Sequence, residues 1–316
     1  MSIRLQIQNK KQILEPVAEG GITVEWEESR TPGKMSFSLL ADKKLRIEQG
    51  NRVKLYVNKK PVFLGYIFIV EQGQGDTVKV ICYDQLRYLK NKDTYIFENK
   101  TADEIIGIIA KDFQLSVGKL AGTGYKFESL VQDNRSLLDI VAEALEETEL
   151  HKNKKYVFYD DFGKLCLASQ DDLRLRLLAD KDTIQDFHYS CSIDGETYNK
   201  IKLVHQDQSA GRRAVYGAQD KSNIDKWGIL QYCESIDGTV NGPDEAEKLL
   251  GLYNRPARSL QLSGVLGDVR VRPGCRIYVN IKTYAGRINA GMTVERVTHN
   301  FSESLHTMDL TLKVNK

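Results

Sequence analysis

The feature that most constrains the fold of this sequence is a change of pattern between residues 75 and 113. Residues 77–83 alternate polar and apolar side chains, which is the period of a half-buried strand. After a charged break, residues 101–113 carry apolar side chains at helical spacing. Thr101 and Glu104 have the spacing of a capping box, in which a hydroxyl and a carboxylate satisfy N–H groups at the start of a helix. The pattern predicts that a β domain ends here and that a helical one begins.

Short alternating segments separated by turn residues fill the first ninety residues, which predicts a small barrel or sandwich. Helical spacing then extends to about residue 150, and a second helix that begins near Ser136 ends in Glu146-Glu-Thr-Glu. Acidic side chains at a C-terminal helix end oppose the helix dipole, so we expect this end to face solvent or a partner. A hairpin with its turn at residues 160–163 follows.

Strands resume at about residue 183, and this later part of the chain resembles the first part. Gly50-Asn-Arg-Val-Lys-Leu-Tyr-Val-Asn is similar to Gly274-Cys-Arg-Ile-Tyr-Val-Asn, and in both places a further strand and a closing hairpin follow. Upstream, residues 31–39 and 194–203 occupy matching places. Any two β domains share such turns and strands, but here the order of the parts also matches. We therefore predict a duplicated barrel with the helical segment between its copies.

These patterns predict an α+β, mainly β, fold of two related small β-barrel domains separated by a helical and mixed insert. We place the first barrel at residues 1–95, the helical and β-hairpin insert at 96–184, and the second barrel at 185–316. A short helix at 242–254 lies inside the second barrel, with Pro243 in its first turn. A chain of 316 residues is long enough for about two domains, each with its own core.

No catalytic, cofactor-binding or metal-binding constellation stands out, so we predict no catalytic residues, no cofactor and no metal ligands. The zinc-protease, nucleophile-elbow and phosphate-loop motifs are missing from the sequence. His299 and His306 flank a short polar segment, where we expect a turn with exposed imidazoles, because a metal site needs more ligands. The five cysteines are scattered and never form Cys-x-x-Cys, which favours a reducing compartment.

The charge balance does not require a polyanionic partner, because 45 basic and 43 acidic residues leave a net charge of +2. A few arginines of the predicted second barrel could face DNA or an acidic partner, although a mixed charged surface is the more ordinary explanation. They are Arg258, Arg270, Arg272, Arg276 and Arg287. The N-terminus has no apolar signal core, and no run approaches the roughly 20 apolar residues of a membrane span. We expect a soluble protein made in the cytoplasm without a signal peptide.

Three places in the sequence together resemble a known family. They are residues 77–113 with Tyr83-Asp-Gln-Leu-Arg-Tyr-Leu, the segment Asp194-Gly-Glu-Thr-Tyr-Asn-Lys-Ile-Lys-Leu, and residues 267–301, which begin Gly267-Asp-Val-Arg-Val-Arg-Pro-Gly. Their order along the chain is similar to that in the XkdQ-like tail proteins of contractile phages, defective prophages and phage-tail-like bacteriocins. That family is related to late control protein D.

The resemblance implies a structural baseplate hub protein, with two barrel-like domains joined by a helical insert. It implies a homotrimeric ring that adapts a sixfold tail tube to a threefold spike. The implied partners are other copies of the chain, the tail tube protein, the central spike protein and the tape-measure protein, with neither membrane insertion nor sequence-specific nucleic-acid binding. The implied location is a virion or phage-tail-like particle assembled in the bacterial cytoplasm.

Two other classes of function stay open. A cell-wall (peptidoglycan) hydrolase component of a phage tail would need two carboxylates about 5–10 Å apart across a cleft, and no motif here pairs two acids. A carbohydrate- or nucleic-acid-binding module would line a groove with exposed aromatic side chains, which 15 tyrosines permit but do not indicate.

Overall fold

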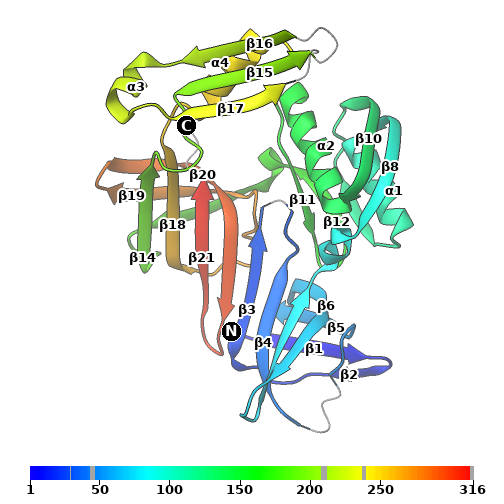
Figure 1. The fold of residues 1–316 in the computed structure, drawn as a ribbon. Coiled ribbons are helices and arrows are strands. Elements are labelled where there is room, and N and C mark those ends of the chain that lie inside the picture. Colours follow the sequence, from blue (N-terminus) through cyan, green and yellow to red (C-terminus); the bar gives the residue numbers. More distant parts are fainter. Residues whose placement is uncertain (29, 43–46, 208–211, 237–239, 314–316) are drawn as a thin grey trace. The chain divides into compact units, whose positions relative to one another are not determined.

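The computed structural model describes residues 1–28, 30–42, 47–207, 212–236 and 240–313. By their contacts the residues divide into two compact units, one made of Met1–His188 with Gln261–Lys316 and the other of Tyr189–Leu260. The first unit contains a large β-sheet and a helical layer, and the second contains a small sheet with helices (Figure 1).

The N-terminal half of the large sheet is a run of antiparallel strands. Along β4 and β5 every second side chain is buried, because one face of the sheet packs on the core. Ile7, Val24, Met35 and Val53 are fully buried in that core. The strands of this half are β1 (Ile3–Asn9), β2 (Gln12–Leu14), β3 (Glu19–Glu27), β4 (Lys34–Leu40), β5 (Arg52–Val57), β6 (Lys60–Gln72) and β7 (Thr77–Tyr83).

The C-terminal half of the large sheet continues directly from the first. Its strands are β13 (Arg174–Asp180), β14 (Asp186–Ser192), β18 (Ala257–Leu266), β19 (Arg276–Thr283), β20 (Gly286–Phe301) and β21 (His306–Lys313). β3 pairs antiparallel with β20, from Glu27 opposite Arg296 to Ile22 opposite Phe301, so both halves belong to one 13-stranded sheet. The predicted mainly β class is confirmed. The predicted small β-barrels are not closed in the described residues, because the outer edge of β3 pairs with the other half of the sheet.

The two halves repeat the same five-strand order. The order is β3-β4-β7-β6-β5 in the first half and β14-β18-β21-β20-β19 in the second. The long fourth strand of each order has a bulge at the same place, between Ile67 and Ile69 in β6 and between Val294 and Arg296 in β20. This confirms the predicted duplication.

The glycines that marked the repeat in the sequence occupy equivalent places. Gly50 and Gly274 both have positive φ, of 84° and 82°, a conformation that a glycine adopts without steric cost. The N–H of Gly50 donates to Ile67 O at 2.8 Å, and the N–H of Gly274 donates to Val294 O at the same distance. Ile67 and Val294 are therefore equivalent positions of the duplicated sheet.

One part of the predicted alignment is wrong. Residues 194–203 were matched to residues 31–39, but the counterpart of β4 is β18, which pairs with β21 as β4 pairs with β7. Residues 194–203 lead instead into β15 of the second unit. The mistake arises because a turn followed by an alternating strand has the same sequence pattern in either place.

A helical layer, residues 85–173, lies between the two halves in the sequence. Its predicted first helix is confirmed, with the capping box in place: the Thr101 N–H donates to Glu104 Oε2 at 2.9 Å, and the Glu104 N–H donates to Thr101 Oγ1 at 3.5 Å. Ile105 and Leu137 belong to one buried core that the two α-helices share. The elements are η1 (Gln85–Lys90), β8 (Lys92–Thr101), α1 (Ala102–Asp112), β9 (Val117–Leu120), β10 (Lys126–Ser136), α2 (Leu137–Lys152), β11 (Tyr156–Asp160), β12 (Leu165–Ser169) and η2 (Gln170–Leu173).

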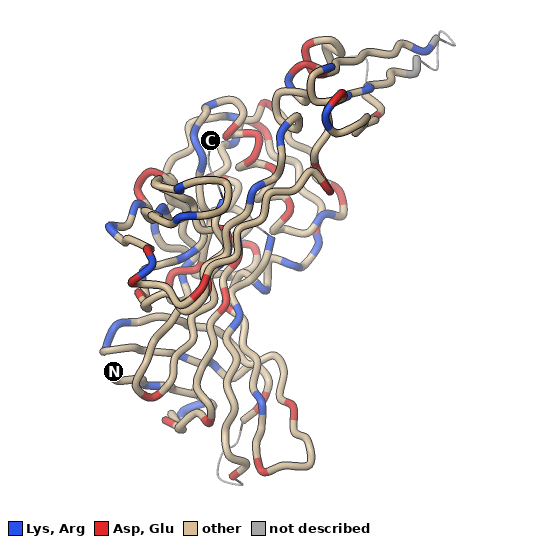
Figure 2. The backbone as a smooth tube through the Cα atoms, turned by 90° about the vertical axis from the view of Figure 1, so that its left-hand side faces the viewer, with Lys and Arg blue, Asp and Glu red and all other residues tan. Residues whose placement is uncertain are grey.

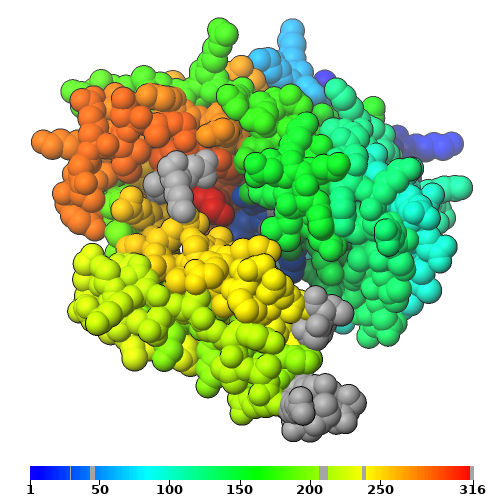
Figure 3. Space-filling view, turned by 90° about the horizontal axis from the view of Figure 1, so that it is seen from above, coloured from blue at the N-terminus to red at the C-terminus, as the bar shows by residue number. Residues whose placement is uncertain are grey.

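The second unit is inserted in the chain between β14 and β18. Its central strand β15 pairs antiparallel with β16 and parallel with β17, and α4 packs on this sheet through the buried side chain of Ala246. Figure 3 shows these residues, yellow-green to yellow, as one continuous body. The elements are β15 (Lys200–Asp207), β16 (Arg212–Gln219), α3 (Lys221–Trp227), β17 (Gln231–Ile236) and α4 (Gly242–Tyr253), the last at the predicted helix.

The predicted division into folding domains stays a prediction. Strand β13 lies within the predicted insert of 96–184 and pairs with β19 of the large sheet.

Candidate functional site

The helical layer and the large sheet meet at a cavity of about 650 Å³ within the first unit. We call this region the layer junction. Residues of α2 and β11 line it from the helical layer, and residues of β3 and β20 line it from the sheet. Those used below are Glu28, Arg30, Asp84, Asp160 and Arg272.

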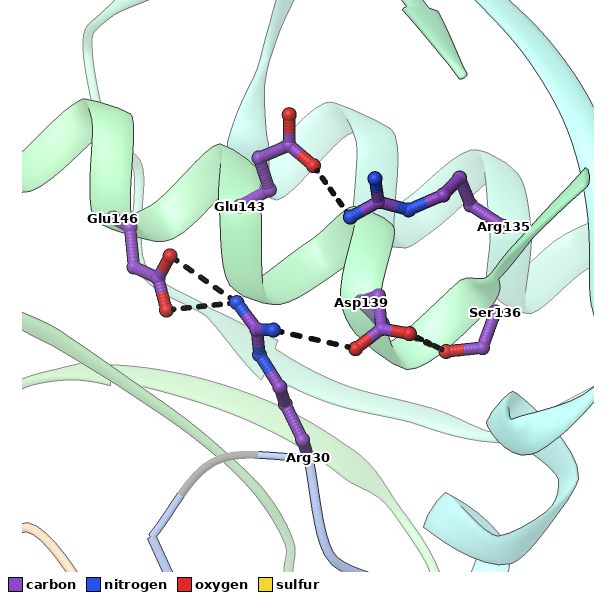
Figure 4. Close-up of polar contacts among 6 residues, drawn as sticks. All are labelled: Arg30, Arg135, Ser136, Asp139, Glu143 and Glu146. Atoms are coloured by element: carbon purple, nitrogen blue, oxygen red, sulfur yellow. Dashed lines mark hydrogen bonds and ion pairs between the residues drawn. The ribbon is translucent and has the colours of Figure 1, made fainter. Parts of the chain in front are cut away.

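Arg30 connects the sheet to helix α2 (Figure 4). It follows β3, and its guanidinium lies 3.1 Å from Glu146 Oε1 and 3.6 Å from Asp139 Oδ1. A second ion pair, between Lys155 of the helical layer and Glu28 after β3, also connects the two layers. Glu146 has 62% of its side chain exposed, so the acid-rich end of α2 does face solvent here, but the partner of Glu146 is an arginine of the same chain. Exposed pairs of this kind contribute little stability, about 0–1 kcal/mol each.

Asp84 is the buried polar centre of the layer junction. Its Oδ2 accepts a hydrogen bond from the Gly33 N–H at 2.9 Å, and its Oδ1 accepts one from the Leu86 N–H at 3.1 Å. The second bond caps η1 of the helical layer, and the first reaches the loop between β3 and β4. Burial and the nearby Asp160 raise the pKa of Asp84 well above its usual range, although both hydrogen bonds oppose this shift. One carboxyl group thus holds the two layers together.

Asp160 is the last residue of β11 and lies near Asp84. Its Oδ1 accepts a hydrogen bond from the Gly163 N–H at 2.7 Å, which closes the hairpin turn, and its Oδ2 has no hydrogen-bond partner among the described residues. Burial raises the pKa of Asp160 to about 7. Nearby, the Arg272 guanidinium lies 4.5 Å from the centre of the Tyr159 ring and 3.5 Å from Asp161.

This geometry is that of a structural junction. A general acid or nucleophile must reach a substrate, but both oxygens of Asp84 are occupied by backbone N–H groups. Asp160 has one oxygen without a hydrogen-bond partner among the described residues, and the Gly163 N–H holds the other. Sequence reasoning did not single out Asp84. The available signal was an aspartate directly after a strand and two residues before the buried Leu86, which is an N-cap position.

The Asp160 carboxyl makes the stability of the junction depend on pH. Its folded-state pKa of about 7 lies above the ~3.9 of an exposed aspartate, so the folded chain binds the proton more tightly. The stabilising contribution is full below about pH 4 and is lost as the pH rises through 7. We expect Asp160→Asn, which cannot ionise, to be more stable than the native chain by about 1–4 kcal/mol at pH 8 and equally stable at pH 4. Urea unfolding at both pH values measures this.

Asp161→Asn is the control, because that neighbouring side chain is 59% exposed and no comparable burial opposes its charge. An Asp160→Asn chain with no advantage at pH 8, or with a larger advantage at pH 4, would contradict the assignment.

The prediction that His299 and His306 are exposed turn residues is wrong for both, because each lies in a strand and His306, the first residue of β21, is half-buried. The His299 side chain is fully buried in β20, where its ring stacks on Phe301. Nε2 lies 3.0 Å from Val271 O and donates to it, so Nδ1 accepts the N–H of His306 Nε2 at 2.9 Å. Burial lowers the pKa of His299 to about 3, which keeps the pair neutral. Strands on both edges of β20 enclose this histidine.

Three of the five arginines that were considered as a basic surface have partners of their own, and one of them, Arg272, pairs with Asp161 at 3.5 Å. Arg270 pairs with Asp268 at 2.6 Å, and Arg287 donates to Asn280 Oδ1 at 2.8 Å. Figure 2 shows basic and acidic residues interspersed along the chain. This is a mixed charged surface, which favours the ordinary explanation. The described residues contain no group of three or more His, Cys, Asp or Glu placed as metal ligands.

A comparison with known protein families shows which family this chain belongs to. A model of the YqbQ-like family matches residues 22–313, which is more than nine tenths of the chain. The chain belongs to the YqbQ-like family. The matched range includes both halves of the large sheet except β1, β2 and the start of β3.

Two relatives of this YqbQ-like chain are similar to it over most of their length. The uncharacterized protein YqbQ of Bacillus subtilis (strain 168) is 30% identical, over 98% of this chain and 95% of its own length. The phage-like element PBSX protein XkdQ of the same organism is 31% identical, over 84% of this chain and 81% of its own. The predicted resemblance to XkdQ-like proteins is confirmed.

A solved structure shows the fold. The 43 kDa tail protein of prophage MuSo2 from Shewanella oneidensis has a TM-score of 0.70, with 98% of each chain covered and 14% sequence identity. The YqbQ-like chain therefore has the fold of a prophage tail protein. In its described part, no helix combines the length and the apolar character needed to cross a membrane.

Proposed function

We propose that this YqbQ-like protein is a structural hub of a phage-tail baseplate. Three chains would form a ring that adapts a sixfold tail tube to a threefold spike. The observation that carries the proposal is the duplicated five-strand sheet. Three chains with two equivalent sheet halves each supply six similar positions around one axis, while the chain itself repeats only three times.

The duplication also supplies the kind of contact that a ring needs. A closed ring with cyclic symmetry, other than a twofold dimer, requires contacts between two different surfaces of neighbouring copies. The two halves of the sheet are related but not identical, so each chain offers two different ends. Within the chain, β3 and β20 already join two such halves by strand pairing.

The proposed partners are other copies of the chain, the tail tube protein, the central spike protein and the tape-measure protein. The proposed location is a virion or phage-tail-like particle assembled in the bacterial cytoplasm. The similarity to XkdQ, which belongs to a phage-like element, supports this location. Neither a membrane nor a specific nucleic-acid sequence is part of the proposal.

We propose a structural role without catalysis, and the layer junction supports it because Asp84 serves two backbone N–H groups. The alternative is a peptidoglycan hydrolase component of the tail. We expect the purified protein to leave a peptidoglycan zymogram uncleared. Clearing that a single Asp or Glu substitution abolishes would establish the alternative.

Light scattering of the full chain, alone and with the spike protein, tests the ring. We expect a species of three chains of 35.9 kDa each, either alone or once the spike is added. A monomer at every concentration, with and without the spike, would contradict the proposal.

A further inference from the structure

Two surfaces of the first unit have the composition of a protein–protein contact. The first lies on the outer face of the N-terminal half of the sheet, beside η1. There Tyr66 and Tyr83 are opposite each other in the strand pairing, and they alternate with Ile67 and Cys82, which are buried in the core. We call this surface the arginine–aromatic cluster, and its residues are Arg52, Tyr66, Phe68, Tyr83, Arg87 and Tyr88.

Aromatic rings fill the middle of the arginine–aromatic cluster. The centre of the Phe68 ring lies 5.5 Å from that of Tyr83 and 5.8 Å from that of Tyr88. All three side chains are half-buried, so part of each ring is exposed. Tyrosine, phenylalanine and arginine are enriched in protein–protein interfaces. The cluster therefore offers an aromatic surface to a partner.

Two arginines lie on this aromatic surface. The Arg87 guanidinium lies over the Phe68 ring, 5.3 Å from its centre, and the Arg52 guanidinium lies over the Tyr66 ring at 5.8 Å. In the described part of the chain, neither arginine forms an ion pair. A guanidinium binds a carboxylate through two parallel hydrogen bonds. The cluster thus presents two cations that can each bind a carboxylate of a partner.

The second surface lies on the ribbon that β8 and β10 form in the helical layer. Phe97 and Leu130 are opposite each other in this ribbon and face the buried core of the layer. The neighbouring residues Ile96 and Val131 are also opposite each other and face away from that core. They are 65% and 63% exposed. An apolar cross-strand pair is thus exposed on the outer face of the ribbon.

Acidic side chains flank this apolar pair. Glu98 follows two residues after Ile96 and is exposed, opposite Ser129. Asp133 follows two residues after Val131, and its Oδ1 accepts a hydrogen bond from the Thr94 hydroxyl at 2.8 Å. We call this surface the ribbon face, and its residues are Thr94, Ile96, Glu98, Ser129, Val131 and Asp133. These six residues include two carboxylates and no basic side chain.

The basic side chains of the ribbon lie elsewhere. Arg135 pairs with Glu143 of α2 at 3.1 Å. Lys92, Lys100 and Lys126 lie at the two ends of the paired stretch. The middle of the ribbon face is therefore apolar and acidic.

We propose that the ribbon face of one copy docks on the arginine–aromatic cluster of the next copy. The exposed pair of Ile96 and Val131 would pack on the aromatic rings, and the carboxylates beside it would bind the two arginines. The inference rests on the proposed ring and names the surfaces that close it. The contact joins two different surfaces of the chain, so it passes from copy to copy and can close.

A single-stranded nucleic acid is the other class of ligand for arginine and aromatic side chains, because bases stack on exposed rings. Here the guanidinium groups already cover one face each of Phe68 and Tyr66, which favours a protein partner. A labelled oligothymidylate that binds the native chain, but not a chain with Arg52→Ala and Arg87→Ala, would assign the cluster to nucleic acid and overturn the proposal.

Two double variants of the full-length chain test the contact by light scattering, under the conditions in which the native chain forms the ring. The first combines Arg52→Ala with Arg87→Ala and removes the two cations. The second combines Ile96→Lys with Val131→Lys and places positive charge opposite the arginines. We expect each to assemble about tenfold or more weakly than the native chain. The melting temperature should change little, because these side chains are half-buried or exposed.

Ile13→Lys is the matched control for the ribbon face. Ile13 is an isoleucine of β2 that is 59% exposed and belongs to neither surface. This variant should assemble like the native chain. Arg52→Ala alone repeats the test of the cluster at one exposed side chain, and it should also weaken assembly. Equal effects of Ile13→Lys and of the lysine double variant would contradict the assignment.

A mixture of the two double variants tests whether the contact joins different surfaces. The alanine variant keeps a native ribbon face, and the lysine variant keeps a native arginine–aromatic cluster. One native contact can therefore form between them, but it cannot propagate. We expect an equimolar mixture to form a species of two chains at concentrations at which each variant alone is monomeric.

A ring that neither double variant weakens, or a mixture that stays monomeric, would contradict this contact while leaving the ring intact. A native chain that stays monomeric at every concentration, with and without the spike, would contradict the ring itself. The failure of the contact and the failure of the proposed function are therefore distinguishable.

Discussion

Replacing Gly21 by alanine is expected to lower the free energy of unfolding by about 3 kcal/mol or more. Gly21 lies in β3 with a φ of 100°, which side chains rarely adopt. A Cβ at this position would lie 2.6 Å from the carbonyl oxygen of Phe301 in β20. That oxygen is backbone and cannot rotate away, so β3 would have to separate from β20. The substitution therefore tests the strand pair that unites the two halves of the sheet.

The adjacent glycine provides the control. Gly20 also has a positive φ, of 71°, but a Cβ there would meet no heavy atom within 4 Å. Gly20→Ala should cost only the conformational strain, about 1 kcal/mol. Urea unfolding of both variants gives the comparison. If Gly20→Ala and Gly21→Ala cost the same, the close approach of β3 to β20 is not what constrains Gly21.

Asp84→Ala is expected to lower the free energy of unfolding by about 2–4 kcal/mol. The change leaves the Gly33 and Leu86 N–H groups buried without an acceptor. Removing a buried carboxyl also removes a desolvation cost, which the raised pKa reveals. The lost bonds outweigh it, because two buried N–H groups lose their acceptor and each unpaired N–H costs about 1–3 kcal/mol.

Asp84→Asn should fall between the native chain and Asp84→Ala, because the amide NH2, a donor, replaces one of the two oxygens and leaves one of the two N–H groups without an acceptor. Asp161→Ala is the surface control and should cost less than about 1 kcal/mol, since that carboxylate is 59% exposed. An Asp84→Ala chain as stable as the native one would show that the layers do not depend on this carboxyl.

Local features of the fold could be read from the sequence. The helix at Thr101 was predictable because its capping box needs only residues three positions apart. The duplication was predictable because Gly50 and Gly274 each start a strand from a turn that requires positive φ. Both signals act within a few residues, and both predictions are confirmed.

Long-range features could not be read in the same way. The pairing of β3 with β20 joins residues about 270 positions apart, and the alternating pattern of each strand is satisfied by many partners. His299 looked like a loop residue because its burial comes from strands on both sides of β20. Asp84 functions through Gly33, which lies 51 positions away. In each case the deciding contact is tertiary, so no local pattern records it.

End-on cryo-electron microscopy of the purified ring tests most directly whether three duplicated chains imitate six subunits. We predict six similar sheet densities on one circle, contributed by three chains of 35.9 kDa. A ring in which the two halves of each chain lie at clearly different radii, or one with a different number of chains, would contradict the proposed hub.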